Sequence, residues 1–255
     1  MCRQYKMYSK KGREGVIISV MNQKGGCGKT TTAWAMASVL RSKGKNVLLV
    51  DLDPQVSLSL LLQLDDSRTI ADVIKGKYDI TDVIQTVDNN GDAVAGSAEL
   101  PLLDSLQERL KAVLKKADRY YDYVIVDSTP TASMVGISIL QASDKRVIPV
   151  QATLPVLLAT KQFKDMIELA KEENPKLDVS GILLVMYDKR GVVTRTLKEI
   201  AEDVAGELGT KVYDTTIRKG IAVEEAWASF KGLIEYAPNS NPAIDYIALV
   251  EEMGV

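Results

Sequence analysis

Seven consecutive residues combine three glycines with two lysines and end in a hydroxyl side chain. They are Lys24-Gly25-Gly26-Cys27-Gly28-Lys29-Thr30, followed by Thr31. Glycines let backbone N–H groups turn toward phosphate oxygens, and a helix that begins there adds the positive end of its dipole. A lysine neutralises the β- and γ-phosphates, and a threonine hydroxyl can ligate Mg²⁺. The segment therefore predicts a phosphate-binding loop for ATP and Mg²⁺.

Acidic residues follow two apolar runs, where a nucleotide hydrolase holds its metal ion and its attacking water. Asp127 ends one run and is expected to hold Mg²⁺ through water. Asp53 follows the other run and is expected to face the γ-phosphate and to lie close to the Mg²⁺. The chain has no histidine, so a carboxylate is the natural group to orient the attacking water. An alternative interpretation is that Asp51 and Asp53 only cap the turn that follows them.

Apolar runs that read as strands alternate with segments that read as helices. The expected strands are Val16–Met21, Asn46–Leu52, Tyr121–Val126, Arg146–Val150 and Gly181–Met186. The expected helices are Lys29–Ser42, Leu102–Ala117, Ser133–Gln141, Pro155–Lys171 and Val192–Leu208. This alternation predicts an α/β fold similar to P-loop NTPases, with a mostly parallel twisted sheet and helices on both faces. Ligands of such sheets bind at the carboxyl ends of the strands, where the loop and both acids are expected.

The domain organisation is simple in this interpretation. No segment reads as a linker, so residues 15–255 are expected to form one ATPase domain. Residues 1–14 are basic and polar and are expected to be a flexible tail. The turn-rich stretch Asp88–Gly96 is expected to be a surface connection.

Composition excludes several classes of protein. The 255 residues carry a net charge of −2 with no histidine and two cysteines. Histidine-based triads, histidine metal sites and a disulfide framework are therefore excluded, and a reducing cytoplasm fits. No apolar run approaches the roughly 20 residues of a membrane helix, so no membrane partner is expected. Any contact with DNA must come from a local basic patch.

Four segments together resemble the ParA/Soj group of partitioning ATPases, which carry a deviant Walker A loop. They are MNQKGGCGKTTTA, VLLVDLDPQ, YDYVIVDSTP and VIPVQAT. Later segments, LLVMYDKR, TIRKGIAVEEAW and IEYAPNSNPAIDYIALVEE, extend the resemblance to about residues 15–253. Gln23 stands where the standard loop has its first glycine, and Lys24 matches the signature lysine of the group. The resemblance implies an ATP-bound sandwich homodimer in which Lys24 reaches the phosphates of the partner. Lys24, Lys29 and Asp53 are then the catalytic residues.

The same resemblance implies a cycle on DNA. The ATP-bound dimer of the group binds DNA without sequence preference, and a ParB-type centromere-binding protein stimulates hydrolysis and releases it. The protein is therefore expected in the cytoplasm on the nucleoid, in the short form that lacks an N-terminal helix-turn-helix domain. Candidate phosphate contacts are basic residues of the C-terminal third. They are Arg190, Arg195, Lys198, Arg218 and Lys219.

The sequence departs from the group at three places. Val56-Ser57-Leu58-Ser59 replaces the usual Gly-Asn-Ala-Thr, Thr129 replaces a proline, and Ala222 replaces an arginine. Other functions on the same loop stay open, among them a metabolic ligase, a MinD-like positioning ATPase and a nucleotide-gated switch with little turnover. A MinD-like protein would end in a basic amphipathic helix, whereas residues 241–255 contain no lysine or arginine.

Overall fold

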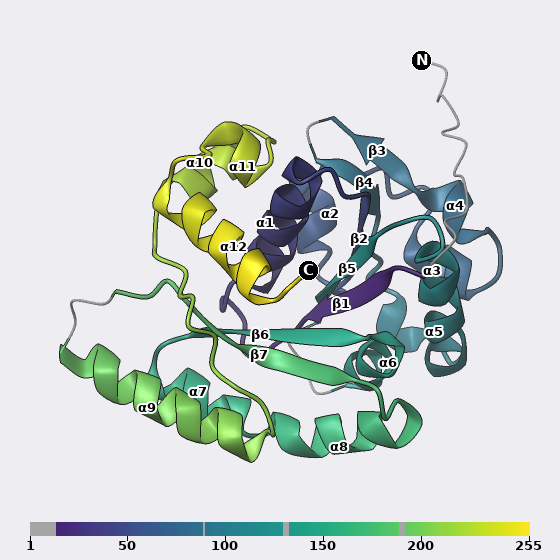
Figure 1. Ribbon diagram of the computed structural model, residues 1–255. Coiled ribbons are helices and arrows are strands. Elements are labelled where there is room, and N and C mark those ends of the chain that lie inside the picture. Colours follow the sequence, from purple (N-terminus) through teal and green to yellow (C-terminus); the bar gives the residue numbers. More distant parts are fainter. Residues whose placement is uncertain (1–13, 89, 130–132, 189–191) are drawn as a thin grey trace.

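The computed structural model describes residues 14–88, 90–129, 133–188 and 192–255 (Figure 1). The basic tail expected at residues 1–14 lies outside this part of the chain except for Glu14, and so does Arg190. The described residues form a seven-stranded sheet in the order β3-β4-β2-β5-β1-β6-β7. The strands are β1 (Val16–Val20), β2 (Val47–Leu52), β3 (Gln85–Val87), β4 (Gly91–Val94), β5 (Tyr123–Ser128), β6 (Lys145–Gln151) and β7 (Asp178–Val185). Only the β3–β4 pair is antiparallel, so the predicted fold class is confirmed.

Helices cover both faces of this sheet. They are α1 (Lys29–Ser42), α2 (Ser57–Leu61), α3 (Ile70–Ile74), α4 (Ile80–Val83), the 3₁₀ helix η1 (Leu100–Leu102), α5 (Leu106–Ala117), α6 (Met134–Ala142), α7 (Leu154–Thr160), α8 (Phe163–Glu173), α9 (Val192–Glu207), α10 (Ala222–Ala228), α11 (Leu233–Tyr236) and α12 (Asn241–Glu252). Strand residues alternate between the faces. Ile18 packs with α1 and α12, whereas Ile17 packs with α5 and α6. A third cluster lies beneath α7, α8 and α9.

Two expectations about elements are wrong. The predicted surface connection Asp88–Gly96 contains β4, which pairs with the interior strand β2. Its Asp92 is buried and accepts hydrogen bonds from the hydroxyls of Tyr121, at 2.9 Å, and Thr86, at 2.7 Å. An acid inside a four-residue strand interrupts the apolar pattern that marks a strand.

The predicted helix Pro155–Lys171 is two helices, α7 and α8. The chain turns between them through short-range bonds, from Lys161 N–H to Leu158 O and from Gln162 N–H to Ala159 O. Helix α7 contacts β6 and α9, whereas α8 packs on α6.

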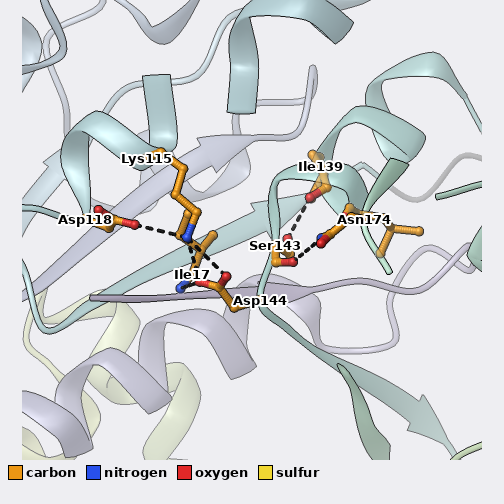
Figure 2. Close-up of polar contacts among 8 residues, drawn as sticks. Ile17, Lys115, Asp118, Ile139, Ser143, Asp144 and Asn174 are labelled. Carbon is orange, nitrogen blue, oxygen red and sulfur yellow. Dashed lines mark hydrogen bonds and ion pairs between the residues drawn. The ribbon is translucent and has the colours of Figure 1, made fainter. Parts of the chain in front are cut away.

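A polar clamp fixes the amino end of β1 (Figure 2). The Asp144 carboxylate, between α6 and β6, accepts the Ile17 N–H at 2.8 Å and the Lys115 ammonium at 3.1 Å. Lys115 lies on α5 and also reaches Asp118, at 3.3 Å. The clamp therefore ties one helix to the strand that leads into the glycine-rich loop. None of the described helices is long and apolar enough to cross a membrane.

Candidate active site

The glycine-rich loop joins the carboxyl end of β1 to the start of α1. Gly26 and Gly28 have left-handed backbones, with φ of 73° and 78°, so glycine is strongly favoured at both positions. Gly28 is the residue before the first turn of α1. Asn22 anchors the loop, because its buried side-chain amide donates to Pro149 O of β6 at 2.7 Å. The loop is thus held so that the N-terminus of α1 faces the carboxyl edge of the sheet, as anion binding requires.

The two lysines of the loop differ in their surroundings. Lys29 is buried, and its ammonium donates to Lys24 O at 3.3 Å, so it lies within the loop. The Lys24 side chain is exposed. A Cβ added at Gly25 would meet no atom within 4 Å, so the loop has open space beside it. The Cys27 thiol donates to Lys24 O at 3.0 Å, and burial raises its pKa, which disfavours a reactive thiolate.

Asp127 is a buried carboxylate whose two oxygens have no hydrogen-bond partner among the described residues. Burial and the neighbouring charge of Asp51 raise the pKa of Asp127 to about 8. The nearby Thr30 hydroxyl and the Lys29 ammonium oppose this rise, whereas Asp53 adds to it. The structure therefore brings Asp127 and Asp53 close to Lys29 and Thr30 of the loop, whereas the Lys24 side chain is exposed.

This arrangement fits a magnesium ion. A desolvated carboxylate without a partner, beside a threonine hydroxyl, is stabilised by a cation. The described residues contain no group of three or more carboxylate, histidine or cysteine side chains that could hold a metal by themselves. Mg²⁺ rarely uses such a cage, because it keeps several waters and takes further ligands from nucleotide phosphates. Thr30 and Asp127 would therefore hold the ion together with the nucleotide.

Asp51 and Asp53 have different surroundings from Asp127. Asp51 lies beside Asp127 in the register of β2 and β5 and is fully buried. Its carboxylate accepts hydrogen bonds from Asp53 N–H, Ser59 N–H and the Ser59 hydroxyl. Asp53 accepts the Gln55 N–H at 3.0 Å, so it forms the turn that was the alternative interpretation, and it also lies close enough to Asp127 to raise its pKa. Ser59 could not be predicted as part of the site, because residues 56–59 differ from the family pattern and their sequence shows no partner for the serine.

The basic candidates fall on two segments that follow the carboxyl end of β7. Arg195 is exposed on α9, and Lys198 lies 3.9 Å from Glu202 on the same helix. Lys219 is exposed in the loop before α10. Arg218 is different, because its guanidinium forms a two-pronged ion pair with Asp245 of α12, at 2.7 and 2.9 Å. Its backbone N–H also donates to Asp245, which gives this arginine a structural bond that the sequence did not predict.

Comparison with known proteins gives a consistent set of relatives. A family model described as an AAA domain matches residues 15–179. The chain is 34% identical over 251 residues to the sporulation initiation inhibitor protein Soj of Bacillus subtilis, with 94% of this chain and 98% of that protein covered. It is 29% identical over 253 residues to the chromosome partitioning protein ParA of Caulobacter vibrioides, with 93% of each covered.

Solved structures of similar fold include nucleotide complexes. A Mycobacterium smegmatis protein described as cobyrinic acid a,c-diamide synthase, with bound ATP analog and magnesium, is 27% identical with a TM-score of 0.78 over 93% of each chain. The cell division ATPase MinD of Pyrococcus furiosus is 25% identical with a TM-score of 0.78, over 94% of this chain and 98% of that chain.

Proposed function

Since the chain belongs to the ParA/Soj family of P-loop ATPases, we propose that it is a Mg²⁺-dependent ATPase that partitions DNA. In this proposal the ATP-bound homodimer binds DNA without sequence preference. A ParB-type partner stimulates hydrolysis, and the protein then leaves the DNA. The observation that carries the ATPase part is the partnerless buried carboxylate of Asp127 beside Thr30 and the glycine-rich loop.

Each residue of the site has a role that follows from its position. Backbone N–H groups of the loop and the N-terminus of α1 bind the phosphates, and Lys29 neutralises their charge from inside the loop. Mg²⁺ bound by Thr30 and Asp127 would supply further charge neutralisation. Asp53 accepts a hydrogen bond from the attacking water and orients it. The backbone of Asp53 is already fixed, because its N–H is bonded to Asp51 at 3.1 Å.

A second copy of the chain completes the site in this proposal. Lys24 is exposed rather than folded onto its own loop, as a lysine that serves a partner subunit must be. Several large apolar side chains that follow strands in the chain are also exposed. These are Leu60, Leu102, Met134, Leu154 and Met186, whose exposed fractions run from 38% to 79%. A dimer interface that includes these side chains would cover them.

Exposed cations near the end of β7 are the proposed DNA contacts. Arg195 and Lys219 are exposed, and each phosphate contact steepens the salt dependence of binding by about 0.9 in log–log slope. Arg218 contributes less to DNA binding than these two, because Asp245 already neutralises its guanidinium.

The test is the rate of ATP hydrolysis with and without non-specific DNA. We expect turnover that DNA stimulates in the wild-type protein and that falls at least about 100-fold in Asp53→Ala. Asp66→Ala is the matched control, because Asp66 is an exposed acid away from the loop. An Asp53→Ala protein that hydrolyses ATP at the control rate would contradict the catalytic assignment.

The same experiment separates the second candidate, a MinD-like or switch protein. MinD of Pyrococcus furiosus shares the fold at 25% identity. The second candidate is therefore a positioning ATPase that does not bind DNA. ATP-dependent dimers that neither bind DNA nor respond to it would favour that candidate. Hydrolysis that depends on a small-molecule acid or amine would instead favour a ligase.

A further inference from the structure

Asp51 is a fully buried carboxylate that accepts hydrogen bonds from two other residues, Asp53 and Ser59. Its Oδ1 accepts the Asp53 N–H at 3.1 Å. Its Oδ2 accepts the Ser59 N–H at 2.8 Å and the Ser59 hydroxyl at 2.6 Å. The hydrogen bonds oppose the rise in the Asp51 pKa that burial causes. Asp51 therefore differs from its neighbour Asp127, whose oxygens accept no hydrogen bond from the described residues.

Ser59 extends this contact to the segment after β4. Its hydroxyl oxygen accepts the Gly96 N–H at 2.8 Å. A Cβ at Gly96 would lie 2.9 Å from the Asp51 carboxyl carbon, so only glycine allows this approach without displacement. We call the three residues Asp51, Ser59 and Gly96 the latch. Because the latch excludes water, each of its hydrogen bonds is costly to lose.

The segment held between Asp53 and Ser59 has a strained backbone. Val56 has φ of 50°, a left-handed conformation that is a clear outlier for a β-branched residue. Its N–H donates to Asp53 O at 2.8 Å, and its own carbonyl accepts the Leu60 N–H at 3.0 Å. Such strain persists only where the surrounding structure holds both ends. Here the latch holds the segment at Asp53 and again at Ser59.

We propose that Asp51 and Ser59 are positioning residues for ATP hydrolysis. They bind no substrate in this proposal. Instead, they fix the backbone of Asp53 so that its carboxylate faces the phosphate loop. The inference rests on the proposed ATPase function, in which Asp53 orients the attacking water. Misplacement of such a group by about 1 Å can lower a rate about 100-fold, so the hydrogen bonds of the latch act on the chemical step rather than on ATP binding.

The kinetic test compares two serines of α2. Ser59→Ala removes the hydroxyl that joins Asp51 to Gly96, whereas Ser57→Ala alters an exposed serine of the same helix. We expect Ser59→Ala to lower kcat about 10-fold or more with KM for ATP within about twofold. Ser59→Thr, which keeps a hydroxyl, should recover most of kcat. A kcat of Ser59→Ala within twofold of Ser57→Ala would overturn the inference, as would equal loss in Ser59→Ala and Ser59→Thr.

Hydrogen exchange of individual amides tests the latch without turnover. The Gly96 and Asp53 amides should exchange at least about 10-fold faster in Ser59→Ala than in Ser57→Ala, whereas amides within β5 should not change. Unchanged exchange at Gly96 and Asp53 would overturn the latch even if kcat falls. A wild-type protein that never hydrolyses ATP would refute the proposed function itself, and the positioning role falls with it. An active wild type with an unaffected Ser59→Ala refutes only the positioning role.

Discussion

Asp51 and Asp127 are identical in type and lie side by side on neighbouring strands, yet their carboxylates have opposite surroundings. Asp51 accepts three hydrogen bonds, whereas the oxygens of Asp127 accept none from the described residues. An unpaired buried carboxylate destabilises the folded chain, and it persists where a ligand compensates for it. The loss of stability caused by the unpaired Asp127 carboxylate is therefore the reason to expect a cation beside it.

Substitution of each aspartate by asparagine should change the free energy of unfolding in opposite directions. At pH 7 and without metal or nucleotide, Asp127→Asn should raise the free energy of unfolding by about 1–3 kcal/mol, because folding raises the pKa of this carboxyl to about 8 and so requires it to take up a proton, whereas asparagine requires none. Asp51→Asn should lower the free energy of unfolding by a similar amount, since an amide has one oxygen and cannot accept both the Asp53 N–H and the Ser59 N–H. Urea unfolding in EDTA measures both. Equal effects of the two substitutions would contradict the distinction.

Mg²⁺ and ATP should stabilise the folded protein through Asp127. A ligand that binds only the folded state stabilises it by an amount set by the ratio of its concentration to its Kd. The wild-type protein should gain stability with Mg²⁺ and ATP, and Asp127→Asn should lose most of that gain. A full gain in Asp127→Asn would show that the ion does not depend on this carboxylate.

The sequence predicted the site at the level of single residues only in part. The loop and Asp127 could be identified because their chemistry depends on neighbours in the chain and on the strand that precedes them. The role of Asp51 could not, because its hydrogen bonds come from Ser59 and indirectly from Gly96, which approach it only in the folded chain. Likewise, a lysine or arginine shows its charge in the sequence but not its partner, and Arg218 is paired with Asp245.

At the scale of elements, the position of the glycine-rich loop depends on the amino end of β1 as well as on its carboxyl end. Asp144 holds the Ile17 N–H, and Lys115 ties α5 to the same carboxylate (Figure 2). Strand β1 runs between β5 and β6 and leads directly into the loop. A shift of its starting end would move Asn22 and the glycines that follow.

Asp144→Ala should therefore cost more stability than loss of an ordinary surface ion pair. It leaves the Ile17 N–H without its acceptor, so we expect a loss of about 1–3 kcal/mol in the free energy of unfolding. Glu251→Ala removes the exposed pair with Lys43, at 2.9 Å, and should cost no more than about 1 kcal/mol. Urea unfolding of both variants gives the comparison. Equal, small losses of stability in Asp144→Ala and Glu251→Ala would mean that the clamp stabilises the chain no more than an exposed ion pair does.

Elements with a continuous apolar pattern were predictable, and those without one were not. Helix α1 matches its expected range, Lys29–Ser42, because its apolar face and its preceding glycines both mark it. Strand β4 was missed because buried Asp92 finds its hydroxyl partners on β3 and beside β5. The break between α7 and α8 was missed because Thr160-Lys161-Gln162 contains no glycine or proline to mark a helix end, although the two helices cover different neighbours.

At the scale of the whole molecule, the described chain places the proposed catalytic groups near the carboxyl ends of β1, β2 and β5. Lys24 is exposed, and so are apolar side chains that follow strands in the chain, and the sequence alone could show neither exposure. The predicted homodimer would cover these side chains and bring Lys24 to the phosphates of the partner. A cation supplied in this way by a second protein can raise hydrolysis by roughly 10³–10⁵-fold.

Lys24→Ala tests whether the site is shared between two subunits. The variant should still bind ATP, because Lys29 and the backbone donors of the loop are intact, but it should lose ATP-dependent dimers and at least about 1,000-fold in turnover. Sedimentation with a non-hydrolysable ATP analogue measures the dimer, and phosphate release measures turnover. Lys164→Ala, which alters an exposed lysine of α8, should behave as wild type in both measurements. Full turnover by a monomeric Lys24→Ala protein would refute the shared site, because each chain would then hydrolyse ATP with its own residues.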